Sequence, residues 1–120
     1  MSLTPAHLLA NAKTDLSFQR TLYEDLHEHP ELSGLERATS QKILGRLENL
    51  DCEIVQPIGG FGIVGVFRNG PGPTALFRAD FDALPVKETT GVPYASTRVQ
   101  ARPDGSTVPV MHSCGHDMHT

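Results

Sequence analysis

The amino-acid sequence predicts an α/β fold in which two helices pack on a partly antiparallel mixed sheet. Two observations lead to this prediction: apolar residues recur at three-to-four spacing early in the chain, and short β-rich runs separated by glycine and proline follow them. With 120 residues and 38% apolar side chains, the chain is long enough for one domain with its own core.

Charge and cysteine usage exclude several classes of protein. The formal net charge is −4 and the basic residues are scattered, so we expect neither a basic stripe nor a nucleic-acid partner. The N-terminus lacks the basic and apolar regions of a signal peptide, and no run approaches the roughly 18 apolar residues of a membrane span. Cys52 and Cys114 are far apart, unlike a secreted disulfide framework. We therefore expect free thiols and a cytoplasmic location, with no membrane partner.

Two helices are expected in the first part of the chain. The first runs from Asp15 to His27 and is stopped by Pro30. The second opens with Ser33 and Glu36, which are spaced as a capping box, and runs to about Leu50. The apolar stripes expected to be buried are Leu16, Phe18, Leu22, Tyr23 and Leu26 in the first helix, and Ala38, Ile43, Leu44, Leu47 and Leu50 in the second.

Three β-rich runs predict an antiparallel meander after the helices. They are Cys52–Val55, Ile63–Phe67 and Thr74–Arg78, and the glycine-rich connections between them are short enough for hairpins. From Lys87 to Thr107 we expect a long loop with room for a short hairpin.

The segment Val110–His119 concentrates three histidines, a thiol and a carboxylate. In an extended backbone Cys114 and His116 would point to the same side, with His112 on that face further back. A helix would point Cys114 and His116 apart, so we expect an extended or turn backbone there. A thiolate and a neutral imidazole suit zinc, cobalt, nickel or manganese, and Gly115 would let the backbone approach the ion. The pattern thus favours a metal site that Cys114 and His116 could both face.

Two other interpretations of this segment remain open. Cys114 can be a small buried residue among ordinary histidines. It can also be a nucleophile with His112 or His116 as its base, although the catalytic partners of a cysteine are normally remote in sequence.

A second constellation, Asp80 and Asp82, follows the third predicted strand. Both carboxylates share one side, at the strand end where α/β sheets commonly place chemistry. One of them could hold a metal-bound histidine from behind, whereas the alternative is a solvated turn with an ion pair to Arg78. A third run contains His27 and His29, which face different directions at a helix end and are expected to be structural.

Five segments in this order and spacing resemble the aminoacylase and carboxypeptidase family of co-catalytic metallopeptidases. The similarity is to the branch of hippurate hydrolase and the indole-acetyl-amino-acid hydrolases. It is carried by Leu26–Leu32, Gly62–Gly65, Arg78–Val86, Gly91–Ser96 and Met111–Asp117.

The resemblance implies the N-terminal part of the catalytic domain of a two-metal amidohydrolase that cleaves N-acyl amino acids. It implies that Cys114 and His116 are metal ligands and that Asp82 supports the centre from behind. Two divalent ions (zinc, manganese, cobalt or nickel), a small-molecule substrate and a homodimer of the full-length protein are expected with it.

The sequence departs from the family pattern mildly in residue type and strongly in length. Phe81 stands where methionine is common, and Ser113 stands where alanine is common. Members of the family are much longer, and their glutamate pair, two further histidine ligands and inserted dimerisation domain come after the position of Thr120. The rival hypothesis is therefore an inactive fragment with weak metal binding or self-association through an open sheet edge.

Overall fold

The computed structural model describes residues 4, 6 and 16–120. Helix α2 (Ser17–Glu28) matches the first predicted helix, and Asp15, its expected start, lies outside the described residues. Leu26 on this helix is almost completely buried, whereas Phe18 is exposed and its ring lies under the Arg46 guanidinium. No helix in this described part of the chain has the length and apolar character needed to cross a bilayer.

Helix α3 (Arg37–Leu47) confirms the second predicted helix, but the predicted capping box is wrong. Ser33 is exposed and the N-cap residue, Glu36, makes no side-chain cap hydrogen bond. Instead the Glu31 carboxylate accepts hydrogen bonds from the Thr39 backbone N–H at 2.7 Å and from its hydroxyl at 2.9 Å. The helix is thus capped by a side chain that the spacing rule did not consider.

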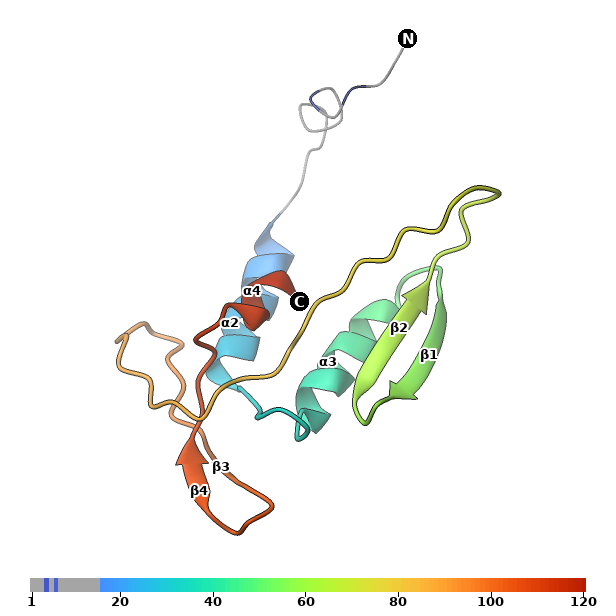
Figure 1. Cartoon of the computed structure of the whole chain (residues 1–120). Helices are drawn as coiled ribbons and strands as arrows, with labels where there is room; N and C mark the ends of the chain where they lie inside the picture. Colours follow the sequence, from blue (N-terminus) through green and yellow to red (C-terminus); the bar gives the residue numbers. More distant parts are fainter. Residues whose placement is uncertain (1–3, 5, 7–15) are drawn as a thin grey trace.

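The first hairpin pairs β1 (Glu53–Ile58) with β2 (Gly62–Val66), as predicted. Helix α3 packs against β2, and the Ser40 hydroxyl donates to the Phe61 carbonyl at 2.7 Å (Figure 1). The predicted buried stripe of this helix is wrong at both ends, since Ala38 and Leu50 are exposed. A two-stranded hairpin is too narrow to cover the whole stripe.

The third predicted strand, Thr74–Arg78, does not form. After a reversal around residues 70–72, residues 73–82 run without regular secondary structure between the hairpin and the C-terminal part of the chain (Figure 1). Leu76 is 84% exposed and Phe77 is 94% exposed. Apolar and β-branched residues favour a strand only where a neighbouring strand takes up the backbone hydrogen bonds, and the described residues offer none here.

The short hairpin expected in the predicted loop, Lys87–Thr107, forms at the end of that loop: β3 (Val99–Ala101) pairs with β4 (Thr107–Pro109), which extends two residues beyond it. The small core beside it consists of Leu32, Ala83 and Val110. A parallel bridge joins Leu32 to Ala83 and an antiparallel bridge joins Leu84 to Met111. The α/β class is confirmed, with helices beside two short antiparallel ladders and these isolated bridges.

Candidate metal centre

The two segments predicted to form the site, around Asp82 and around His116, meet at the bridge between Leu84 and Met111. The two residues exchange both backbone hydrogen bonds, each at 3.0 Å. On the other side of the same segment, the Ala83 N–H donates to the Glu31 carbonyl at 2.7 Å. These contacts place Asp82 next to the turn that leads into helix α4 (His116–His119).

The His116 imidazole is held by Asp82. Its Nδ1 lies 2.8 Å from the Asp82 carboxylate Oδ1 and 2.9 Å from the Asp82 carbonyl oxygen. Two acceptors at Nδ1 select the tautomer with a proton on that nitrogen, which leaves the Nε2 lone pair available. A carboxylate that binds the far nitrogen of an imidazole is the usual support of a metal-ligating histidine.

Asp80 completes a group of three candidate ligands. One side-chain atom each from Asp80, Asp82 and His116 all lie within 4.8 Å of one another. These three half-buried residues line a groove of about 550 Å³ together with Arg78. Arg78 Nη2 is 2.6 Å from Asp80 Oδ1, so the predicted alternative of an ion pair to Arg78 is present for Asp80.

Cys114 lies outside this group in the part of the chain that the structure describes. Its side chain is exposed, which excludes the interpretation of Cys114 as a small buried residue. The expected extended or turn backbone is found at Cys114 but is wrong at His116, because His116 opens α4. Gly115 adopts φ 78°, and this left-handed turn breaks the strand-like alternation on which the shared face of Cys114 and His116 depended.

Gly115 serves the turn itself. A Cβ built on it would meet no atom within 4 Å, so a side chain would have open space but a strained backbone. The prediction assigned this glycine to close approach of the backbone to an ion, whereas the structure assigns it to a positive φ.

His112 is buried, and both of its ring nitrogens are without a hydrogen-bond partner among the described groups. Burial lowers the pKa of this imidazole below its ordinary value of 6.5, which favours the neutral form. The neutral form is the one that can accept a hydrogen bond or bind a cation.

His27 and His29 point to different partners, as predicted. His27 is buried and contacts the carboxylates of Asp117 and Glu88, whereas His29 is exposed and contacts Asp25. The Asp117 carboxylate was counted in the histidine-rich segment but was given no partner. Glu88 was not predicted, because it lies in the expected long loop and belongs to no motif.

Comparisons with known proteins point to one family. Residues 76–120 match the sequence profile of a family described as Peptidase family M20/M25/M40. An N-acetylcysteine deacetylase of Bacillus subtilis is 44% identical over 80% of this chain and 23% of its own length. A hippurate hydrolase of Campylobacter jejuni is 38% identical over 79% of this chain and 23% of its own length.

A solved structure shows the same relationship. The Bacillus subtilis protein described as a dinuclear metal binding peptidase from the M20 family superposes with a TM-score of 0.72 at 38% identity. The match covers 86% of this chain and 27% of the solved one. The chain thus spans about a quarter of the length of these relatives.

Proposed function

The chain belongs to peptidase family M20/M25/M40, and on that premise we propose that it is the N-terminal part of the catalytic domain of a metal-dependent amidohydrolase. Its contribution to the active site is the group of candidate ligands around His116, namely Asp80, Asp82 and His116 itself, with Cys114. The pair His116 and Asp82 is the observation that carries the proposal.

The donor chemistry of this group fits a divalent cation. The Nδ1 contact with Asp82 leaves the Nε2 lone pair of His116 available, Asp80 adds a carboxylate oxygen, and the Cys114 thiol is accessible. Imidazole, carboxylate and thiolate together suit zinc, manganese, cobalt or nickel. We propose Cys114 and His116 as ligands and Asp82 as the residue that orients His116.

Two divalent ions, when bound, supply the Lewis acidity that polarises an amide carbonyl and activates water. A catalytic zinc typically takes three protein ligands, so two ions require more donors than Cys114 and His116 provide. In this proposal the further ligands and the general base come from residues beyond Thr120.

The exposed apolar segment supports a larger domain. Leu76 and Phe77 lie almost completely in solvent, and Phe67 in the same connecting segment is also exposed. Clusters of large apolar side chains are usually covered in a folded protein. We propose that the remaining part of the catalytic domain covers them, and that a dimerisation domain follows in the full-length protein.

The proposed substrates are N-acyl amino acids of the hippurate type. Two relatives are named for the removal of an acyl group from an amino acid: the N-acetylcysteine deacetylase and the hippurate hydrolase. A small-molecule substrate and a homodimer of the full-length protein are part of this proposal. Both cysteines are unpaired, which supports a reducing compartment such as the cytoplasm.

Hippurate turnover and metal content, measured on the same samples of full-length protein, test this function. Replacing Cys114 or His116 by Ala is expected to abolish turnover together with the loss of metal. The control is His29→Ala, since His29 is exposed and contacts only its helix neighbour Asp25 in the described structure. It should keep its metal.

Two results would contradict the proposal. Full turnover with retained metal in the Cys114→Ala variant would remove Cys114 from the ligand set. A metal-loaded full-length protein that hydrolyses no N-acyl amino acid would overturn the function itself, in favour of a protein that only binds metal.

A further inference from the structure

His27 lies between two buried carboxylates that come from distant parts of the chain. Its Nδ1 is 2.6 Å from Asp117 Oδ2 and its Nε2 is 3.0 Å from Glu88 Oε1. The side chains of Glu88 and Asp117 are 0% and 3% exposed, and that of His27 is 9% exposed. Both nitrogens of one imidazole are therefore used, each by a different segment.

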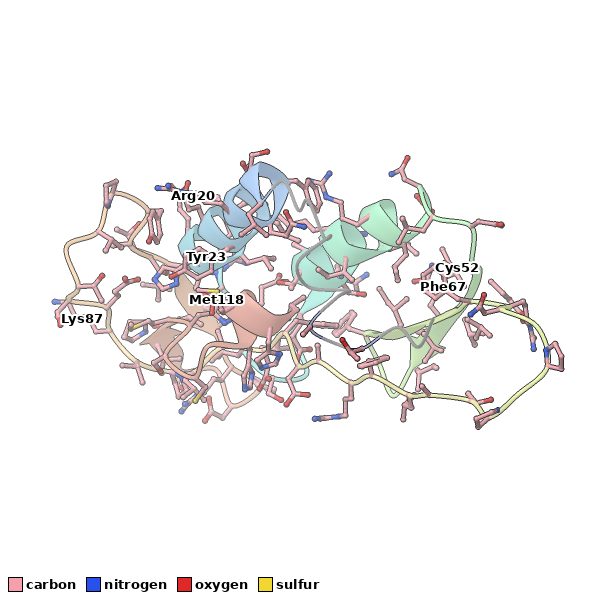
Figure 2. The ribbon with its side chains drawn as sticks, turned by 90° about the horizontal axis from the view of Figure 1, so that it is seen from above. Arg20, Tyr23, Cys52, Phe67, Lys87 and Met118 are labelled. Carbon is pink, nitrogen blue, oxygen red and sulfur yellow. The ribbon has the colours of Figure 1, made fainter. Side chains whose placement is uncertain are left out.

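The three residues join α2, the loop after Pro85 and α4. Glu88 is itself held in place, because its Oε2 accepts the Ser96 backbone N–H at 2.6 Å and its Oε1 contacts the Thr90 hydroxyl. Asp117 belongs to α4, which lies beside α2 in both views and contacts it (Figures 1 and 2). His27 thus connects a fixed loop to the helix that carries His116.

Two tyrosines enclose this imidazole. The rings of Tyr23 and Tyr94 have centroids 5.6 Å and 5.4 Å from that of His27, and they also contact each other edge-on. Aromatic walls keep water away from the two charged contacts, so that solvent screens them less than it would on the surface.

The charge state of His27 follows from its two carboxylate partners. Desolvation lowers the pKa of His27, but hydrogen bonds to Glu88 and Asp117 and their negative charges outweigh it, so the pKa is raised above 6.5. The other titratable groups near His27 are Tyr23, Tyr94 and His112. An imidazolium that donates both N–H groups satisfies two carboxylates that would otherwise be buried without a counter-charge.

Helix α4 cannot hold its own position. It has four residues, which is about one turn, and an isolated turn of helix is unstable in water. Its described anchors are the His27–Asp117 contact, the Asp82 contact with His116, and the Thr120 hydroxyl on the Asp80 carbonyl at 2.6 Å. The second and third anchors come from the Asp80–Asp82 segment, whereas the first comes from α2.

We infer that His27 is a positioning residue for the metal centre. His27 is held by Glu88 and binds Asp117, and this contact fixes the start of α4 so that His116 is directed at Asp82. This inference rests on the proposed function. It makes His27 part of the metal site without contact to the ion or to substrate, and it separates His27 from its exposed neighbour His29.

The test compares two replacements that each keep one of the two contacts. Asn carries its amide nitrogen the same number of bonds from Cβ as Nδ1, so His27→Asn can still reach Asp117. Gln carries its amide nitrogen at the position of Nε2, so His27→Gln reaches only Glu88. His29→Gln is the control, and manganese is the probe for metal affinity of the metal-free full-length protein.

We expect His27→Gln to weaken manganese binding by about tenfold or more while it remains folded, as losses of supporting contacts do. His27→Asn should lose clearly less, and His29→Gln should bind as the unaltered protein does. Hydrogen exchange at the amides of α4 should be faster in His27→Gln than in His27→Asn. For hippurate, kcat should fall more than KM rises, because His27 does not touch the substrate.

Equal manganese affinity in folded His27→Gln and unaltered protein would overturn the positioning role. So would unfolding of both His27 variants, since that would make His27 a core residue of α2. If the unaltered protein itself bound no manganese and cleaved no N-acyl amino acid, the proposed function would fail, and the positioning role would fall with it. Loss of affinity in His27→Gln alone supports both.

Discussion

His116 Nδ1 lies 2.8 Å from Asp82 Oδ1, across 34 positions of sequence. The contact leaves Nε2 as the imidazole nitrogen that can bind a metal ion. It also joins the two segments in which the sequence places candidate ligands. Asp82 is therefore the residue through which the metal affinity of the site can be tested most directly.

Asp82→Asn should weaken metal binding by about 10-fold to 100-fold, because the amide is neutral and no longer raises the basicity of His116. Titration calorimetry with zinc or manganese on the full-length protein measures this change. The control is Asp51→Asn, since Asp51 is exposed after α3. An Asp82 variant that binds metal as tightly as the control would show that this contact does not support a ligand.

The stability of the protein should fall as the pH rises above about 6.5, through the titration of His27. Its pKa is raised in the folded state, so the folded protein holds this proton more tightly than the unfolded chain does. The stabilisation is fully present below the unfolded pKa of 6.5 and is lost as the pH passes the folded pKa. Urea unfolding from pH 6 to pH 9 measures the slope, which should be shallower in His27→Gln. An unchanged slope in that variant would assign the pH dependence to another group.

Two glycine replacements should act in opposite directions. Gly115→Ala should cost about 1–2 kcal/mol, because φ 78° is unfavourable for a residue with a Cβ although the space is open. Gly45→Ala should stabilise by about 0.5–1 kcal/mol, because Gly45 lies inside α3 and its added Cβ meets no atom within 4 Å. Thermal unfolding of both variants provides the comparison. A gain from Gly115→Ala would contradict the left-handed turn before His116.

Removal of the remote cap on α3 should cost about 1–3 kcal/mol in Glu31→Ala, because the N–H and hydroxyl of buried Thr39 lose their acceptor. The control is Glu48→Ala at the exposed C-terminal end of the same helix. Denaturant unfolding of the two variants separates the contribution of the helix cap to stability from that of a surface charge. Equal losses would show that the Glu31 carboxylate contributes only as a surface charge does.

Residues 1–120 alone should not hydrolyse hippurate in the presence of zinc, manganese or cobalt. The reason is the number of donors, since the described group offers one imidazole and two carboxylates and the proposal adds one thiolate. A turnover assay of the purified chain beside the full-length protein decides this. Clear metal-dependent turnover by the short chain would mean that its residues suffice for catalysis.

Local patterns in the sequence were enough for the elements whose stability is local. The spacing of Leu22 and Leu26 before Pro30 predicted α2, and glycines between two β-rich runs predicted the first hairpin. The residue types in Arg78–Pro85 and Val110–His119 were enough to indicate the pair Asp80 and Asp82 and the residues Cys114 and His116, because metal ligands come from few amino acids. The choice of Asp82 from that pair came from the family resemblance.

Tertiary structure decided what depends on residues far apart in the chain. The run Thr74–Arg78 has strand composition but finds no partner strand among the described residues. The cap of α3 comes from Glu31, which lies before the turn at residues 33 and 34 and holds its carboxylate against Thr39. Likewise, the left-handed Gly115 starts a helix at His116, while Glu88 and Asp117 enclose His27 from segments 61 and 90 positions away. Hydrogen bonds and ion pairs act over a few ångströms in space. The folded path of the chain determines which side chains come that close, and local periodicity does not encode that path.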